Sequence, residues 1–319
     1  MKKTNLIILI IVATCLGLVS SEISLERKMV VKSANHYLFF TLTDIAVDES
    51  GNIYIADEKG KTLLKLDISG KLLHRTVSKK GEGPGDLPGA IRWIRCGDGK
   101  VYLGFRRYFA IQVYNDELNF QYKISLNRRV MDLAVRDGML YIPNLYTNID
   151  FPVRILMDPG EGIAVNSQNQ LPSADQIAAH RWGNWLTLTV DREHNIFTAR
   201  LFTDRIEKWN REGAQLWSTH LFDGHSVRLK NGRPDFPRSF YYTDIARDSR
   251  DNIYVLAGSR AQNPRRDIYV LSPKGKHLIT LTLPQTSNFI RIDGNNRLYV
   301  RGGIGKDVVI KYQIKNLVD

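Results

Sequence analysis

One short motif recurs along the whole chain, and it constrains the fold more than any other feature. Each copy has an acidic residue, two or three turn residues, a glycine or asparagine, and then an apolar–aromatic–apolar triplet, as in Asp48-Glu-Ser-Gly-Asn-Ile-Tyr-Ile. The six aromatic anchors are Tyr54, Tyr102, Tyr141, Phe197, Tyr254 and Tyr299. Repeats at this spacing predict sheets arranged radially around one axis.

Every anchor has the same surroundings. An alternating apolar strand precedes it, such as Ile45-Ala-Val, and a third strand follows it, such as Leu63-Leu-Lys-Leu-Asp. A second turn, often with a glycine such as Gly70 or Gly213, leads to a fourth strand. Period-two alternation with regular turns, and no sustained helical periodicity, predicts an all-β fold. We expect a six-bladed β-propeller of four-stranded antiparallel blades over residues 42–319.

The last repeat ends after its third strand, at Tyr312-Gln-Ile. Residues 22–41 contain a spare extended segment around Met29-Val-Val. We expect this N-terminal segment to supply the outer strand of the last blade, because pairing the two ends of the chain closes the ring and removes an exposed edge.

Residues 1–21 are typical of a signal peptide. Lys2 and Lys3 precede an apolar run from Leu6 to Val19, and small residues at the expected positions place the mature start near Glu22. The chain is therefore predicted to be exported, to the periplasm or the exterior. Two alternatives are a retained membrane anchor and lipidation at Cys15, where Val-Ala-Thr-Cys resembles a lipobox with threonine in place of the usual small residue. No later apolar run is long enough for a membrane span.

The blades resemble NHL repeats, and Lys80-Gly-Glu-Gly-Pro-Gly-Asp-Leu resembles the glycine-rich joint between consecutive blades of that family. The resemblance covers about residues 42 to 314 and is strongest to exported six-bladed propellers of bacteria. Related propellers include gluconolactonase-like hydrolases and amidating lyases, which build metal sites at the channel. Their ligand sets cannot be matched residue by residue to this chain.

The formal net charge is +12, which in an exported protein favours an anionic small molecule, a glycan or an acidic protein partner over nucleic acid. The loops between second and third strands hold eleven basic and six acidic residues, whereas the turns between first and second strands hold nine acidic and five basic residues. These loops and turns lie on opposite faces of a propeller, so we expect a basic loop face and an acidic turn face. The candidate ligand-binding residues are Arg106, Arg107, Arg200, Arg205, Arg260, Arg265, Arg266 and Arg301. The long blade joint 219–242 is the best single candidate for contact with a partner, and we expect a monomer.

Three aspartates, Asp44, Asp132 and Asp244, occupy equivalent positions on the innermost strands of blades one, three and five. The corresponding residues of the other blades are expected to be Arg92, Thr187 and Phe289. Three carboxylates at one channel mouth could bind Ca²⁺, which prefers oxygen ligands, and would then support a Ca-type hydrolase or lyase. They could instead accept hydrogen bonds from nearby backbone, as aspartates readily do.

The sequence favours the hydrogen-bonding interpretation. It therefore favours a binding or scaffold propeller without a cofactor over an enzyme. No histidine pair has zinc spacing, and no nucleophile elbow or dinucleotide fingerprint occurs.

Overall fold

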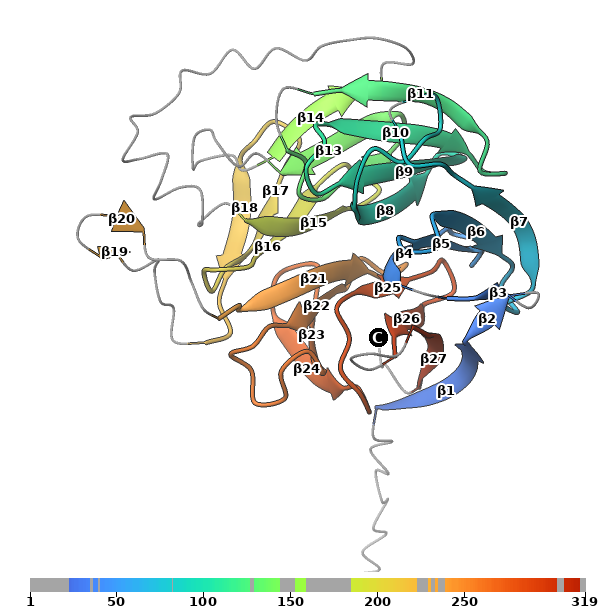
Figure 1. Ribbon diagram of the computed structural model, residues 1–319. Helices are drawn as coiled ribbons and strands as arrows, with labels where there is room; N and C mark the ends of the chain where they lie inside the picture. Colours follow the sequence, from blue (N-terminus) through green and yellow to red (C-terminus); the bar gives the residue numbers. More distant parts are fainter. Residues whose placement is uncertain are drawn as a thin grey trace, which may run out of the picture.

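The computed structural model describes residues 23–34, 37–39, 41–81, 83–126, 129–143, 153–158, 185–222, 229–230, 233–234, 239–302 and 307–315. Within these ranges all regular elements are β-strands, and none forms a helix of a length and hydrophobicity suited to crossing a membrane. Six sheets surround a central axis, with their first strands innermost (Figure 1). The six-bladed β-propeller predicted from the repeats is confirmed.

The blades follow one another in chain order. Blade 1 consists of β4 (Leu42–Val47), β5 (Ile53–Asp57), β6 (Thr62–Leu66) and β7 (Leu72–Val77); blade 2 of β8 (Ile91–Gly97), β9 (Lys100–Phe105), β10 (Ala110–Asn115) and β11 (Phe120–Ser125); blade 3 of β12 (Ala134–Arg136), β13 (Met139–Pro143) and β14 (Val153–Met157). Blade 4 consists of β15 (Leu186–Val190), β16 (Ile196–Arg200), β17 (Ile206–Trp209) and β18 (Gln215–Thr219); blade 5 of β21 (Tyr242–Arg247), β22 (Ile253–Ala257), β23 (Asp267–Leu271) and β24 (His277–Thr282); blade 6 of β25 (Ile290–Ile292), β26 (Arg297–Arg301), β27 (Val309–Lys315) and β1 (Ser24–Val31). Two short ladders lie outside the blades: β2 (Ser33–Ala34) with β3 (Tyr37–Leu38), and β19 (Leu229–Lys230) with β20 (Arg233–Pro234). The residues that follow β14 and Asp158 lie outside the described ranges, so blade 3 is described with three strands.

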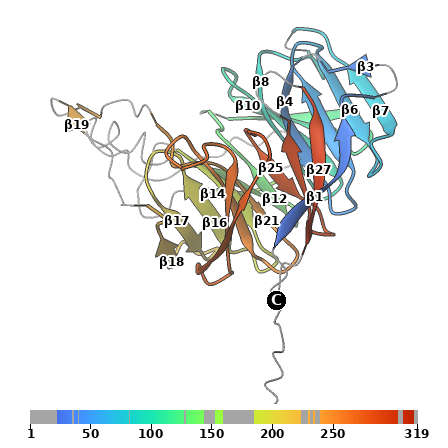
Figure 2. The same ribbon diagram turned by 90° about the horizontal axis from the view of Figure 1, so that it is seen from below.

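The two ends of the chain meet in blade 6, as predicted. β1 pairs antiparallel with β27 from Ser24 opposite Lys315 to Val31 opposite Val309, with a bulge between Arg27 and Met29 (Figure 2). The predicted signal-peptide cleavage near residue 22 falls just ahead of this strand. A mature chain cut there would therefore keep the whole closing strand.

The recurring motif has a physical reason in the turn that it builds. In blade 1, Asp48 accepts hydrogen bonds from the Asn52 backbone at 2.8 Å and from the Tyr54 hydroxyl at 3.3 Å. The fourth residue of the motif has a left-handed backbone, with φ of 88° at Gly51 and 64° at Asp251. The acidic residue thus stabilises the hairpin turn and satisfies the hydroxyl of the buried aromatic anchor at once.

The looser copies of the motif use other partners for the same hydroxyl. Tyr102 donates to Asp158 of blade 3 at 2.9 Å, and the Tyr141 hydroxyl lies 2.6 Å from His194 Nδ1 of blade 4. In blade 4 the anchor Phe197 has no hydroxyl, and Lys208 Nζ lies 4.8 Å from its ring centre. The anchors therefore keep their buried positions while the polar partner changes.

Candidate functional site

Six side chains, one from the innermost part of each blade, form a closed ring of polar contacts across the central channel. In blade order they are Asp44, Arg95, Asp132, Thr187, Asp244 and Arg291. We call this set the channel ring. Arg95 Nη1 lies 2.5 Å from Asp44 Oδ2, and its Nη2 bonds Asp132. Arg291 bonds Asp44 at 2.7 Å and Asp244 at 2.5 Å.

Thr187 closes the remaining gap in the channel ring. Its hydroxyl donates to Asp132 Oδ2 at 2.7 Å and lies 3.2 Å from Asp244 Oδ1. Three carboxylates thus face two guanidinium groups and one hydroxyl, which leaves one excess negative charge.

Each aspartate of the channel ring also joins two neighbouring blades through the backbone. The donors are the N–H of the next residue and an N–H of the following blade: Ile45 (2.8 Å) and Ile94 (3.3 Å) for Asp44, Leu133 (2.9 Å) and Leu188 (3.2 Å) for Asp132, and Ile245 (3.0 Å) and Ile290 (2.8 Å) for Asp244. The carboxylates therefore serve as hydrogen-bond acceptors, and all their donors except Leu133, which directly precedes β12, belong to the innermost strands.

The prediction that Arg92 is the blade 2 equivalent of Asp44 is wrong. Trp93, and not Arg92, is the blade 2 equivalent of Asp44, because both β4 and β8 contain a bulge immediately before this position. Trp93 packs over Gly104, where an added Cβ would lie 2.0 Å from the indole. The expected positions of Thr187 and Phe289 agree with the strand registers.

Two charged members of the channel ring, Arg95 and Arg291, were not predicted. Arg95 lies opposite the anchor Tyr102, and Arg291 lies opposite the anchor Tyr299. The corresponding residue of blade 1 is Ala46, and two other blades also have alanine at this position. Arginine in two blades at a position that is alanine in three others is a signal in the sequence. It becomes readable only when the repeats are aligned on their anchors.

The electrostatics of the channel ring follow from its burial. Burial raises the pKa of Asp244, against the lowering effect of Arg291 and Arg95. Burial acts to lower the pKa of Arg95, but the charges of Asp132 and Asp44 outweigh it and raise this pKa. A calcium ion at the three aspartates would have to displace both guanidinium groups. No group of three or more histidine, cysteine or acidic residues in the described ranges is placed to hold a metal.

The channel opens on the loop face into a cavity of about 400 Å³. Its lining includes the three aspartates of the channel ring together with Arg92, Arg106, Trp185, Asn288 and Phe289. Arg92 lies 5.8 Å from the Trp185 ring centre and donates from Nε to the Met131 carbonyl at 3.2 Å. Burial lowers the pKa of Arg92; Asp132 opposes this, and the nearby charges of Arg129 and Arg106 lower it further. Positive charge is therefore concentrated at this mouth.

The eight arginines proposed from sequence have different surroundings. Arg200 is buried and forms an ion pair with the buried Glu207 at 2.8 Å, and Arg205 approaches the same carboxylate at 3.8 Å. Arg301 pairs with Asp307 at 2.8 Å. Arg266 donates to the Leu283 carbonyl at 2.7 Å.

The other four candidates have no ion pair within the described ranges. Arg106 and Arg107 are exposed. Arg260 lies 4.5 Å from the Tyr241 ring centre, and Arg265 bonds Asn288 at 3.1 Å. Of the eight, only Arg106 lines the loop-face cavity, and Arg265 reaches its edge through Asn288. Most of the joint 219–242 lies outside the described residues.

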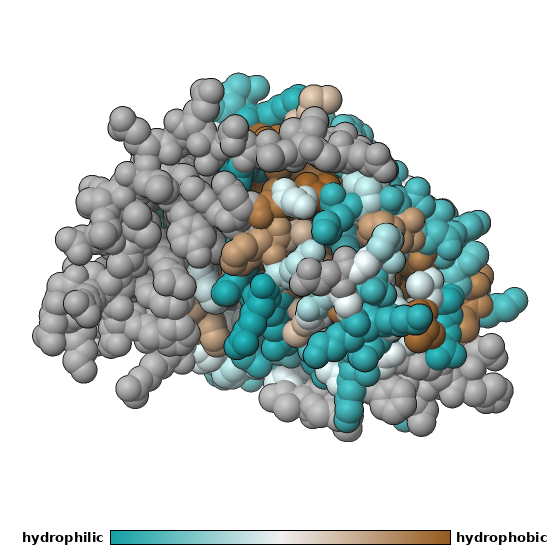
Figure 3. Space-filling model, turned by 45° about the horizontal axis from the view of Figure 1, so that its top comes forward, coloured by the Kyte–Doolittle hydropathy of each residue, from teal (hydrophilic) through white to brown (hydrophobic). Residues whose placement is uncertain are grey.

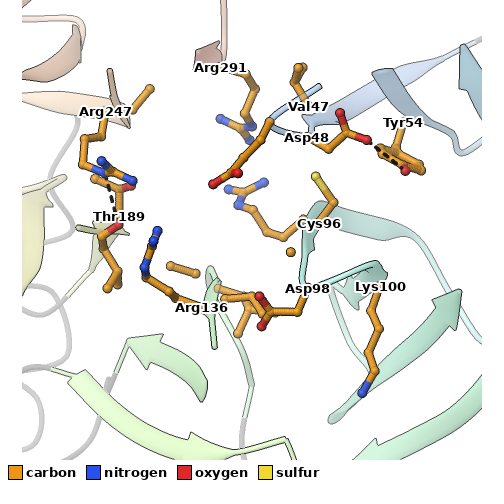
Figure 4. Close-up of a pocket in the computed structure, with 18 of the residues that line it drawn as sticks. Val47, Asp48, Tyr54, Cys96, Asp98, Lys100, Arg136, Thr189, Arg247 and Arg291 are labelled. Carbon is orange, nitrogen blue, oxygen red and sulfur yellow. Dashed lines mark hydrogen bonds between the residues drawn. The ribbon is translucent and has the colours of Figure 1, made fainter. Parts of the chain in front are cut away.

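A second cavity, of about 750 Å³, opens on the turn face (Figure 4). Arg95 and Arg291 line both cavities, so the channel ring separates them. The turn-face lining also contains Cys96, in which burial raises the thiol pKa to about 12. A thiol held protonated in this way is a poor nucleophile.

The surface shows no extended apolar docking region among the described residues. Figure 3 shows hydrophilic side chains beside smaller hydrophobic groups on the face turned to the viewer. Large exposed apolar side chains such as Leu73, Leu216 and Leu278 stand singly on the outer strands of different blades. Single exposed apolar side chains of this kind are normal on a protein surface.

No protein-family model matches the chain, and neither does any curated protein. Solved structures do match. The RRP9 WD40 repeats share 14% identity at a TM-score of 0.58, covering 92% of this chain and 100% of that chain. A member of the duf4221 family from Bacteroides vulgatus shares 12% identity at a TM-score of 0.58, covering 93% and 99%. Virginiamycin B lyase from Staphylococcus aureus shares 11% identity at a TM-score of 0.52, covering 92% and 99%. At these identities the similarity shows the propeller fold alone, and the NHL resemblance is not confirmed.

Proposed function

We propose that this protein is an exported binding propeller that holds an anionic glycan or an acidic protein on its loop face. One observation carries the proposal: four arginines of the loop face, Arg106, Arg107, Arg260 and Arg265, form no ion pair with any described residue. Arg106 lines the loop-face cavity, and Arg265 bonds Asn288 of its lining. Guanidinium groups without a counter-ion on one face raise the local concentration of anions and speed their association.

The arginine geometry suits carboxylate or sulfate groups. A guanidinium group presents parallel N–H donors that bind such anions in bidentate fashion, and it stacks on aromatic rings. Two arginines of this face already lie over aromatic rings, Arg260 over Tyr241 and Arg92 over Trp185. Their Nε atoms donate to Ser239 Oγ and to the Met131 carbonyl, and these contacts hold the two guanidinium groups in place.

Export supports the choice of partner. A propeller outside the cytoplasm meets acidic glycans and proteins rather than nucleic acid. A single copy presents the complete loop face, so the proposed binding needs no second subunit. Lipidation at Cys15 would tether the propeller at the cell envelope.

The alternative is a Ca-type hydrolase or lyase with its site at the channel mouth. The propeller fold shared with virginiamycin B lyase is compatible with it. It would need Asp44, Asp132 and Asp244 as metal ligands, and these carboxylates contact guanidinium groups and backbone N–H groups instead. Binding therefore has the better support.

The test replaces Arg106, Arg107, Arg260 and Arg265 together by glutamine and measures binding to immobilised dextran sulfate. We expect the affinity to fall at least about tenfold, since hydrogen bonds between charged groups contribute well over 1 kcal/mol in total. The control variant carries the same change at four exposed cations of the turn face: Lys71, Arg192, Lys274 and Lys276. It should bind within about twofold of the wild type. Equal losses in both variants would show that only net charge matters and would contradict the proposal, as would no loss in either.

A further inference from the structure

The turn-face cavity contains a cluster of four arginines, of which the charge count of loops and turns included only Arg136. Arg95, Arg136, Arg247 and Arg291 line its inner wall, with side-chain exposures of 16, 20, 15 and 11%. Three acidic residues of the lining are nearer the solvent: Glu49 and Asp98 are exposed, and the Asp137 side chain is 63% exposed. Asp48, which also lines the cavity, is half-buried. Positive charge thus lies deep in the cavity, and most of the negative charge lies at its rim.

Two of these arginines retain free hydrogen-bonding capacity. Arg136 Nε is buried without a hydrogen-bond partner among the described residues, and the nearest carboxylate oxygen of Asp137 lies 3.6 Å away. Arg247 donates from Nε to the Val190 carbonyl at 3.1 Å and from Nη1 to Asp251, and its Nη2 makes no hydrogen bond within the described ranges. Figure 4 shows the guanidinium groups of Arg136, Arg247 and Arg291 pointing into the cavity. A buried N–H donor without a partner is costly, so an anion here would be stabilised.

The remaining lining indicates what else a ligand would carry. Tyr54 is the only aromatic residue among the described residues of the lining, and its hydroxyl bonds Asp48. Ser50, Asn52 and the rim carboxylates offer acceptors for ligand hydroxyl groups. The volume of about 750 Å³ is in the range of small-molecule sites. Apolar side chains such as Leu188 and Ile245 also line the cavity, and its arginines and acceptor groups match the two kinds of polar group on a polyhydroxylated acid.

We propose that the turn-face cavity binds a small acidic sugar. Arg136 and Arg247 bind its carboxylate, and its hydroxyl groups donate hydrogen bonds to Glu49 and neighbouring rim residues. This site is independent of the loop-face function. It lies on the other side of the channel ring and shares no residue with the four loop-face arginines. Each site therefore stands or fails without the other.

The experiment is a calorimetric titration of the predicted mature chain, which starts near Glu22, with galacturonate. We expect a Kd on the order of 0.1–1 mM for the wild type, which corresponds to a few charge-assisted hydrogen bonds. Arg136→Gln should weaken binding at least about tenfold. The matched control is Arg192→Gln, which makes the same change at an exposed residue of the turn face outside the cavity, and it should bind like the wild type. The loop-face glutamine variant should also bind galacturonate like the wild type.

Several outcomes overturn the proposal. These are no binding to the wild type, equal binding to Arg136→Gln, or galactose binding as tightly as galacturonate, because galactose lacks the carboxylate. If Arg136→Gln does not fold, Glu49→Gln provides the second test at an exposed position. This substitution should lower the affinity for galacturonate several-fold and leave the affinity for acetate unchanged. Unchanged affinity for galacturonate in Glu49→Gln would contradict the assignment of the sugar hydroxyl groups.

Discussion

At the scale of single residues, the channel ring shows how charged side chains are accommodated at the centre of the propeller. Asp44 accepts hydrogen bonds from two backbone N–H groups and contacts both Arg95 and Arg291. Its side chain is only 7% exposed, so protein groups take the place of water around the carboxylate. A buried ion pair adds little net stability when both partners are present. It becomes costly when one partner is removed, since the other charge stays buried.

Asp44→Asn tests this point. The substitution removes the carboxylate that Arg95 and Arg291 share, so each of these buried guanidinium groups keeps only one charged partner. We therefore expect the free energy of unfolding to fall by about 3 kcal/mol. The measurement is urea denaturation at neutral pH. Glu26→Gln is the control, because Glu26 is 46% exposed and its contacts with Lys28 and Lys315 are on the surface. This substitution should leave the denaturation midpoint close to that of the wild type, because solvent screens the contacts of an exposed carboxylate. Similar losses for both substitutions would mean that the channel ring is not the buried network described here.

At this scale the sequence predicts residues that recur in several repeats, but not residues whose role depends on a partner in another blade. Asp44, Asp132 and Asp244 are recognisable as equivalent because the same short motif surrounds them. Arg95 and Arg291 are not, because each contacts aspartates of the two flanking blades and therefore makes sense only in three dimensions. Spatial pairing between residues about 50 or 250 positions apart leaves no local pattern in a chain.

At the scale of strands, the repeat predicted the hairpins well, because turn chemistry is local. The acidic residue, the left-handed fourth position and the aromatic anchor all belong to one short segment, as Asp48, Gly51 and Tyr54 show. The β-bulges were not predicted. Bulges in β4, β8 and β21 interrupt the alternation of side chains, and this interruption led to Arg92 being placed where Trp93 lies.

The closing strand gives a prediction at the same scale. Removing residues up to Val31 deletes β1 and leaves the outer edge of β27 without a partner. An unpaired edge strand templates association with other chains, so we expect a lower melting temperature and dimers or larger species in size-exclusion chromatography. A chain starting at Ile23 keeps β1 and is the control. A monomeric deletion variant with an unchanged melting temperature would show that β1 does not close the ring.

At the scale of the whole molecule, the propeller separates two polar cavities by a charged partition. The expected basic loop face has four arginines that form no ion pair with a described residue, and one of them, Arg106, lines its cavity. The expected acidic turn face has acidic residues at its rim, but arginines from the innermost strands lie beneath them. A charge count restricted to loops and turns could not include Arg95, Arg247 or Arg291, because these residues belong to strands. Export, the mature start and the nature of the ligands stay predictions.

The central claim is that the two mouths of the channel bind anions independently, with the channel ring between them. Hydrogen–deuterium exchange on the wild type, measured with dextran sulfate and then with galacturonate, tests it most directly. We predict that dextran sulfate slows exchange in loop-face segments 105–109 and 258–266 alone, and that galacturonate slows it in turn-face segments 134–137 and 245–251 alone. Protection of both sets by one ligand, or of neither set by both ligands, would contradict the claim.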